Sequence, residues 1–231
     1  MRYIILITIL LSAFIVGFKT MNPLPAATPA YQQIESNIGF QWAFGALIGK
    51  DKELVSITRD TVLKSGEEVK MLVKLTKECF VYLVRYGSKG EIELLFPYNV
   101  QQFQKDYVTD KNYYSPPGRD WFSLDKNTGK EVFFLLASTE RLVDIEAKIG
   151  DYQSADSLKK SVLAAGIVSD IRNVRKRYSS FATIAEKPLV IGGNIRAITE
   201  VKETKRPDVA DIATEISAKT FYSKTITIDH Q

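Results

Sequence analysis

The chain has 231 residues, of which 45% are hydrophobic and 25% are charged, and this composition is ordinary for a globular protein with one sizeable core. Its formal net charge of +4 is too small an excess to indicate nucleic acid as a partner, and we expect none. The single cysteine, Cys79, excludes an internal disulfide and a cysteine metal cluster. Its apolar neighbours predict a buried structural thiol.

The first element in chain order is an apolar run, residues 3–18, which follows Arg2 and contains no charged residue. A positive start and a short apolar run are typical of a secretory signal peptide, and the run is slightly shorter than the roughly 20 residues that span a bilayer. Both a cleaved signal peptide and an uncleaved anchor therefore stay open. We expect residues 1–30 to be this signal peptide or N-terminal anchor plus a Pro/Ala linker, and residues 31–231 to be a single β-rich domain.

Several short segments have the composition of β-strands, because they are rich in β-branched and aromatic residues and are bounded by turn residues. They are residues 40–48, 69–75, 79–86, 91–96, 120–124, 131–138 and 220–228. Residues 79–86 read CFVYLVRY and are apolar enough for a strand that is buried on both faces. Gly87 or Gly90 supplies the positive φ of a tight turn, so residues 79–96 predict an antiparallel hairpin that Pro97 ends. We interpret residues 100–119 as a long ordered loop.

Helical spacing replaces the strand pattern after residue 138. Thr139 is the predicted cap of a short helix, and Ser154 is the predicted cap of a longer one. The apolar face of the longer helix is predicted to contain Leu158, Val162, Ala165, Val168, Ile171, Val174 and Tyr178. A further strand is predicted at residues 188–191, and residues 200–211 are predicted to be exposed. The whole pattern predicts a mainly β fold with α additions (α+β), in which an antiparallel β-sandwich core carries one or two helices in the C-terminal half.

Several motifs follow one another in a recognisable order: CFVYLV, a short Gly turn, LLFP, SPPGRDWFSL, a G-K-E step and VFFLLAS. In this order they resemble the family called domain of unknown function 4384, over about residues 55–138. The family usually has Asn directly after LFP, whereas Tyr98 precedes Asn99 here. The resemblance implies a mostly β domain of bacterial envelope or exported proteins, and it implies no catalytic residues.

The sequence offers little of the chemistry that enzymes use, and we expect no catalytic residues, no cofactor and no metal. His230 is the single histidine and the penultimate residue, where chains usually fray, so we expect it to be uninvolved. A zinc site needs three or four suitable ligands. The alternation of Glu91 and Glu93 favours a solvated strand face, although a carboxylate pair is also what a glycosidase needs.

Two features are candidate binding surfaces. The first is aromatic: Phe103, Tyr107, Tyr113, Tyr114 and Trp121. Such rings suit interfaces, but they also suit a segment that folds back to seal one end of the core, and both interpretations stay open. The second is the basic end of the longer helix: Arg172, Arg175, Lys176 and Arg177. These cations complement the helix dipole, or they form a patch for lipid headgroups or an acidic partner.

We therefore predict a non-enzymatic, exported bacterial envelope protein that binds another protein or an envelope polymer. The expected partner is another envelope protein, with membrane contact through the N-terminal segment. The expected location is the periplasm or cell surface, either free or anchored to the inner membrane. Two alternatives stay open, namely an exported hydrolase that uses a carboxylate pair and a membrane-surface protein that binds anionic lipid through the basic helix end.

Overall fold

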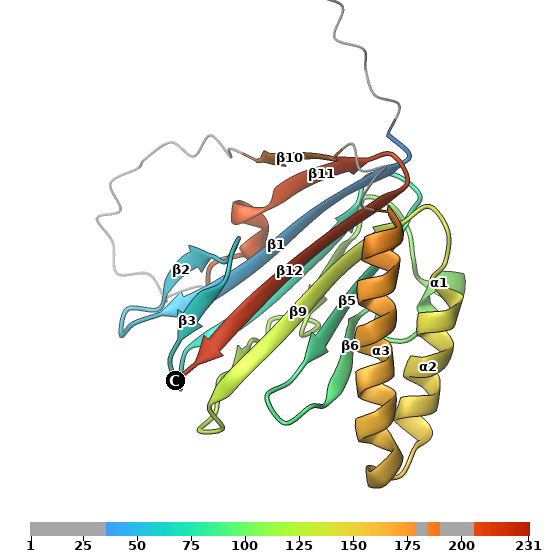
Figure 1. Ribbon diagram of the computed structural model, residues 1–231. Coiled ribbons are helices and arrows are strands. Elements are labelled where there is room, and N and C mark those ends of the chain that lie inside the picture. The colour runs from blue at the N-terminus through green and yellow to red at the C-terminus, as the bar shows by residue number, and fades with distance from the viewer. Residues whose placement is uncertain (1–35, 179–183, 190–205) are drawn as a thin grey trace, which may run out of the picture. The chain divides into compact units, whose positions relative to one another are not determined.

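The computed structural model describes residues 36–178, 184–189 and 206–231, which all belong to one compact unit (Figure 1). The predicted signal or anchor lies outside these residues. The first of two sheets has the strand order β10 (Ile184–Pro188), β11 (Thr214–Ala218), β1 (Ile38–Ile48), β4 (Glu68–Leu75) and β7 (Asn112–Ser115). Two short strands extend it, since β2 (Glu53–Ser56) pairs with β1 and β8 (Phe122–Ser123) pairs with β4.

The second sheet has the order β3 (Thr61–Leu63), β12 (Phe221–His230), β9 (Gly129–Ser138), β5 (Phe80–Tyr86) and β6 (Ile92–Phe96). All of its pairs are antiparallel except β3 with β12, which run parallel. The predicted hairpin is β5 and β6, and Gly90 takes the positive φ of the turn, at +84°. The α+β sandwich expected from the sequence is therefore confirmed.

The main core lies between the two sheets. Alternate residues of each strand point to opposite faces, so one strand can contribute to this core and to a second cluster outside it. On β5, Val81 and Leu83 pack in this core, whereas Tyr82 and Val84 pack on the other face. The two sheets meet through aromatic side chains, such as Phe44 of β1 and Phe133 of β9, whose ring centroids are 4.9 Å apart in an edge-to-face arrangement. Cys79 is buried here, as predicted.

Two helices cover the outer face of the second sheet, α2 (Val143–Ser154) and α3 (Ser157–Tyr178), which lie side by side in Figure 1. A short helix, α1 (Gln102–Lys105), follows β6, and a 3-10 turn, η2 (Val209–Ile212), packs on the outer face of the first sheet. Among the described residues, no helix combines the length and the apolar character needed to cross a membrane.

Several local predictions are wrong. Residues 100–119 are not a loop throughout, because they contain α1 and β7. Leu142 precedes α2 without a side-chain cap, so Thr139 does not cap it, and Ser154 is the last residue of α2. Instead, the carboxylate of Asp156 accepts a hydrogen bond from the backbone N–H of Lys159, near the start of α3.

The apolar face predicted for α3 is confirmed for Val168, Ile171, Val174 and Tyr178, which pack in the cluster on the second sheet, and is wrong for Leu158, Val162 and Ala165, which are exposed. The buried residues of α3 are Ala164, Ile167, Val168 and Ile171, whereas Leu158 and Val162 are 86% and 73% exposed. In the remaining segments, Pro188 ends β10 and residues 190–205 lie outside the described residues. Val209, expected to be exposed, is instead the buried residue of η2 and packs on Ala43 and Leu72 of the first sheet.

Candidate functional site

One end of the sandwich is polar where its strands should continue the apolar core. On β5 the residues that face the first sheet are Val81, Leu83 and then Arg85. On β9, Glu131 follows the same alternation before Phe133 and Leu135. The strand pattern therefore places charged side chains between the sheets.

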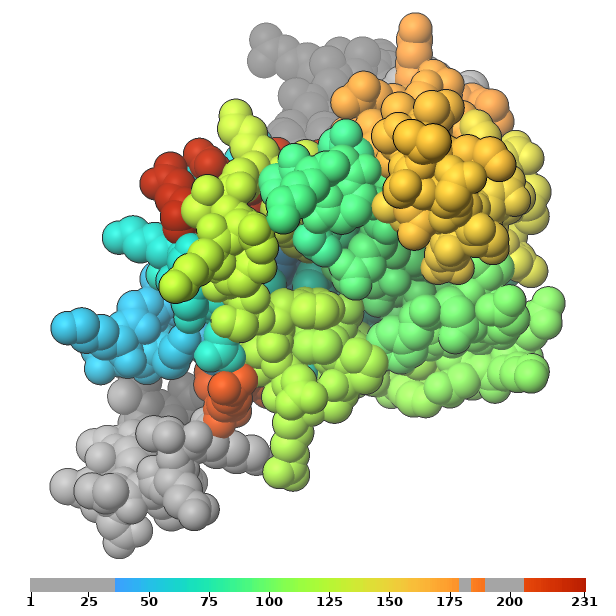
Figure 2. Space-filling view, turned by 90° about the horizontal axis from the view of Figure 1, so that it is seen from below, coloured from blue at the N-terminus to red at the C-terminus, as the bar shows by residue number. Residues whose placement is uncertain are grey.

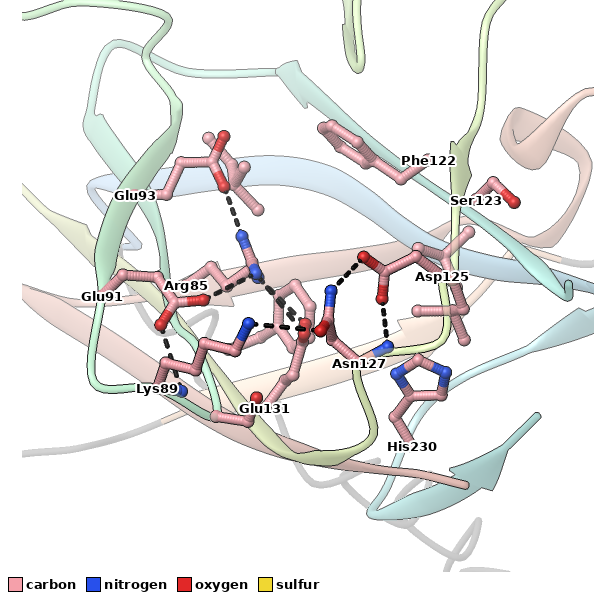
Figure 3. Close-up of a pocket in the computed structure, with 15 residues that line it drawn as sticks. Arg85, Lys89, Glu91, Glu93, Phe122, Ser123, Asp125, Asn127, Glu131 and His230 are labelled. Atoms are coloured by element: carbon pink, nitrogen blue, oxygen red, sulfur yellow. Dashed lines mark hydrogen bonds and ion pairs between the residues drawn. The ribbon is translucent and has the colours of Figure 1, made fainter. Parts of the chain in front are cut away.

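A cavity of about 210 Å³ occupies this end (Figure 3). Its apolar wall is formed by Val69, Leu95, Phe122, Leu124 and Phe133. Its polar wall is formed by Arg85, Ser88, Lys89, Glu91, Glu93, Ser123, Asp125, Asn127, Glu131 and His230. The cavity is therefore amphipathic, and its size suits one side chain or one small polar molecule.

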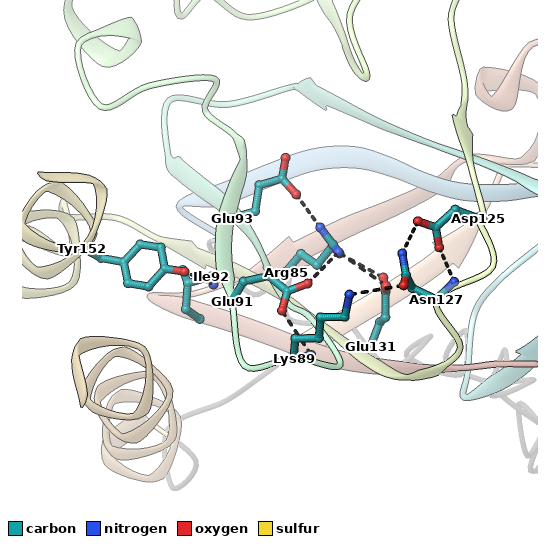
Figure 4. A network of polar contacts seen from close by, with 9 residues as sticks. All are labelled: Arg85, Lys89, Glu91, Ile92, Glu93, Asp125, Asn127, Glu131 and Tyr152. Atoms are coloured by element: carbon teal, nitrogen blue, oxygen red, sulfur yellow. Dashed lines mark hydrogen bonds and ion pairs between the residues drawn. The ribbon is translucent and has the colours of Figure 1, made fainter. Parts of the chain in front are cut away.

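The Arg85 guanidinium is the centre of the polar wall and contacts three carboxylates (Figure 4). Its Nε donates to Glu131 at 2.9 Å, its Nη1 donates to Glu93 at 2.6 Å, and its Nη2 reaches Glu91 at 3.4 Å. Burial disfavours the charged guanidinium, but the hydrogen bonds and charges of Glu131 and Glu93 together outweigh this effect and raise the pKa of Arg85. This cluster of Arg85, Glu91, Glu93 and Glu131 is called the Arg85 cluster below.

The β5–β6 turn and the loop before β9 complete the polar wall. Lys89 donates from its Nζ to the side chain of Asn127 at 3.2 Å, and its backbone N–H donates to Glu91 at 3.1 Å. The backbone N–H of Asn127 donates to Asp125 at 2.7 Å, and this bond lowers the pKa of the Asp125 carboxyl. The two segments are thus joined across the rim of the cavity.

His230 lies in the cavity wall and is 2% exposed, so the expectation that this tail frays is wrong, whereas the expectation that His230 takes no part in function stays a prediction. It pairs with Gly129 of β9 and Leu63 of β3, which fix its backbone on both sides. Its Nε2 lies 3.1 Å from the hydroxyl of Ser65. No hydrogen bond to its Nδ1 occurs among the described residues.

The wall has a surplus of negative charge. It carries four carboxylates, on Glu91, Glu93, Asp125 and Glu131, against the two cations of Arg85 and Lys89. No group of three or more side chains suited to hold a metal ion occurs among the described residues. The arrangement therefore fits a cationic organic group better than an anion.

The predicted aromatic surface divides into two places. Tyr107 and Tyr113 pack at the opposite end of the sandwich, where Tyr113 is 2% exposed, and Phe103 contacts Tyr107 from the cluster on the outer face of the second sheet. The Tyr107 hydroxyl donates to the carbonyl of Cys79 and accepts from the N–H of Val81. These three rings therefore pack inside the protein, which is the second of the two interpretations given above. Substituting them is expected to change stability before it changes binding.

Tyr114 and Trp121 lie on the outer face of the first sheet around the buried side chain of Lys70. The Nζ of Lys70 donates to the carbonyls of Gly118 and Asp120 at 2.7 and 2.6 Å. Burial lowers the pKa of Lys70, against the raising effect of Asp120. This arrangement holds residues 116–121 on the sheet, and a binding role for the two rings stays a prediction.

The predicted basic residues lie at the C-terminal end of α3. Arg175 donates to the hydroxyls of Thr225 at 2.7 Å and Ser223 at 3.3 Å, so it ties the helix to β12. The other three, Arg172, Lys176 and Arg177, are exposed. The structure therefore keeps these four residues together, and Arg175 anchors this end of the helix to the second sheet.

Sequence reasoning missed Arg85, Glu131 and His230 as site residues, and it treated Glu93 as part of a solvated face. Glu93 is partly exposed, at 47% for its side chain, but it is paired with Arg85. The signal that could have identified Arg85 is the alternation of residues along the strand. In CFVYLVRY, Arg85 follows Val81 and Leu83 at intervals of two, so a charged residue stands at a core-facing position.

The comparisons with known proteins agree with the motifs. Residues 62–141 match the model of a family described as Domain of unknown function (DUF4384), which confirms the resemblance over these residues. Neither the curated proteins nor the solved structures gave a match. The matched residues span β4 to β9 and include every member of the Arg85 cluster.

Proposed function

We propose that this chain, whose residues 62–141 match this domain of unknown function, is a non-enzymatic binding module of the bacterial envelope. Its ligand is a basic side chain of a partner protein, which enters the cavity beside the Arg85 cluster. The observation that supports the proposal is the cavity itself. It is amphipathic and has a surplus of negative charge, and it lies where the strand alternation predicts apolar core residues.

A lysine or arginine side chain fits both walls of the cavity. Its alkyl stem can pack on Phe122 and Leu95, as long basic side chains do on apolar surfaces. Its charged head can then reach Glu93, whose Oε2 is engaged by Arg85 and whose other carboxylate oxygen has no partner among the described residues. The existing Arg85 charge is already compensated by three carboxylates, which leaves the balance negative.

The Arg85 cluster favours binding over the alternative of a hydrolase. Glycosidases place two carboxyl groups on either side of the bond that they cleave. Here Glu93 and Glu131 both contact Arg85, so the guanidinium occupies the position between them that a substrate would need. The apolar run at residues 3–18 supports export, and hence a partner in the envelope.

The test is a titration of the isotope-labelled protein with short peptides, followed by backbone NMR shifts. The probes are the acetylated, amidated tripeptides Gly-Lys-Gly, Gly-Arg-Gly and Gly-Glu-Gly, together with N-acetylglucosamine. We expect the two basic peptides to shift the amides of Ser88, Lys89 and Asn127, and the acidic peptide to shift none of them. Glu93→Gln is expected to weaken the effect, whereas Glu78→Gln, an exposed carboxylate outside the cavity wall, leaves it unchanged.

Three results would overturn the proposal. Shifts at the cavity with the sugar alone would assign it to an envelope polymer. Hydrolysis of a glycan or peptide that is lost in Glu93→Gln or Glu131→Gln would assign it to catalysis. Absence of cavity shifts with both basic peptides also rejects the proposed ligand class.

A further inference from the structure

The solvent-facing side of α3 has an order of side chains that the packing of the helix does not require. Six residues at helical spacing lie on one stripe: Leu158, Val162, Ala165, Ser169, Arg172 and Lys176. At about 100° per residue they fall within an arc of about 80°. All six are exposed, and Leu158 and Val162 have the largest exposed fractions among the large hydrophobic residues that the structure describes. The stripe is apolar at its start and basic at its end.

The charges of α3 are almost all of one sign. The helix carries six basic residues, Lys159, Lys160, Arg172, Arg175, Lys176 and Arg177, and one acidic residue, Asp170. Asp170 is engaged by Lys148 of α2, with its carboxylate 2.5 Å from the Lys148 Nζ. It therefore offers little compensation to the cations on the exposed side.

The stripe cannot turn inward in this fold. Ile167 and Ile171 are fully buried against the second sheet, and they lie on the opposite side of the helix. Arg175 fixes the rotation of α3 through its hydrogen bonds to Ser223 and Thr225. Figure 2 looks along α3 from its start, and the gold surface at this end of the helix is not covered by other described segments.

We propose that this stripe is a docking surface for an anionic lipid bilayer. Leu158 and Val162 are placed to enter the boundary between headgroups and acyl chains, while Arg172, Lys176 and Arg177 contact lipid phosphates. Charge complementarity selects this occupant, because the exposed cations and apolar residues share one face without an intervening carboxylate. The small residues Ala165 and Ser169 between them allow the helix to approach the surface closely.

The test is vesicle sedimentation of the purified full chain. The vesicles are phosphatidylcholine alone or phosphatidylcholine with 40% phosphatidylglycerol. Residues 1–35 are common to all variants, so differences between variants report on α3. We expect Arg172→Glu with Lys176→Glu to weaken binding to the anionic vesicles by at least about 25-fold, at roughly fivefold for each cation. Added salt is expected to weaken the parent but to have little effect on this variant.

A matched control and a second variant complete the experiment. Lys126→Glu with Lys130→Glu reverses two exposed cations outside α3 and is expected to change binding by less than threefold. Leu158→Ser with Val162→Ser is expected to weaken binding severalfold while leaving the melting temperature unchanged, because both side chains are exposed. A tryptophan placed at Leu158 (Leu158→Trp) is expected to be quenched by brominated lipid.

The proposal is overturned if the charge-reversed α3 variant and the control variant bind anionic vesicles equally well. It is also overturned if Leu158→Ser with Val162→Ser abolishes self-association in sedimentation equilibrium and leaves vesicle binding intact, since a second copy of the chain would then be the occupant. An unquenched tryptophan at position 158 in the presence of bound vesicles would assign the contact to another part of the chain.

Discussion

The two ends of the sandwich are built from the same strands and filled by opposite means. At one end, which we call the aromatic end, Phe96 of β6 packs against Tyr113 and Tyr107, with ring centroids 5.2 and 5.8 Å away. At the other end, β5 contributes Arg85 and β6 contributes Glu93, and a cavity remains. Aromatic rings therefore fill the space between the sheets at one end, and charged side chains border a cavity at the other.

The difference lies in where the polar atoms end up. The hydroxyl of Tyr107 forms hydrogen bonds with the carbonyl of Cys79 and the N–H of Val81. One side chain therefore fills the aromatic end and also satisfies two backbone polar groups. The Arg85 cluster satisfies its charges mainly with one another, and its planar guanidinium leaves volume beside it. We infer that the aromatic end carries stability and that the ionic end keeps space for a ligand.

The largest expected effect is at the aromatic end. Tyr113→Ala removes a ring that is 2% exposed and packs on Phe96, and we expect a loss of about 3–5 kcal/mol in the free energy of unfolding. Urea denaturation measures it. Tyr98→Ala, which removes a more exposed ring in contact with the same Phe96, is the control and is expected to lose less. Equal losses in the two variants would contradict the assigned roles.

The next effect is at the ionic end. Arg85→Met keeps most of the side-chain volume but leaves three carboxylates without their cation, and we expect a loss of about 1–3 kcal/mol. Adding Glu93→Gln to Arg85→Met is expected to recover part of this loss, because it removes one of the uncompensated charges. A double variant as unstable as the sum of its two single variants would show that the cluster is not coupled.

A smaller effect concerns the turn that positions the cluster. Gly90→Ala places a side chain at φ +84° and is expected to cost about 1–2 kcal/mol in thermal or urea unfolding. Gly87 does not have a positive φ, but a Cβ there would meet the side chain of Glu91. Gly87→Ala is therefore expected to displace Glu91 from Arg85 and to change the peptide titration more than the stability. A Gly90→Ala variant as stable as the parent would refute the turn assignment.

The smallest effect is a dependence on pH at the aromatic end. Burial raises the pKa of the Cys79 thiol from an ordinary value of 9.0 to about 11. The native state therefore holds this proton more tightly than the unfolded chain, and the resulting stability is complete below pH 9 and is lost as the pH rises toward 11. We expect the free energy of unfolding to fall by about 1 kcal/mol between pH 8 and pH 10, and less in Cys79→Ala. Identical pH profiles for the two proteins would show that the thiol does not contribute.

Much of the fold was predictable because strand composition and turn residues are local. The hairpin of β5 and β6 and the strands β1, β9 and β12 follow from such patterns. Strand β7 was missed because its tyrosines stand beside two prolines and resemble a loop. The exposure of Leu158 and Val162 on α3 was missed because both are apolar, and only the docking of the helix on the sheet shows that its other side is buried.

The candidate site was harder to predict than the fold, since it depends on segments that are distant in the sequence. The core-facing position of Arg85 could be predicted from the alternation along its strand. Its partner Glu131 lies on another strand, so the pairing could not be predicted. His230 comes to the cavity because β12 is inserted between β3 and β9. No local sequence pattern predicts that β12 inserts between β3 and β9, so the C-terminal residues were expected to fray.

The insertion of β12 also has a consequence for how the chain folds. Residues 221–230 complete the middle of a sheet whose other strands come from residues 61–138. Until they arrive, β9 has an unpaired edge and β3 is separated from the rest of its sheet. Pairings of such high contact order close a long loop before any hydrogen bonds are gained, so this step is expected to be slow. During that interval the open edge of β9 is the segment most exposed to strand exchange with another chain, and a chaperone that shields unpaired edges would find it there.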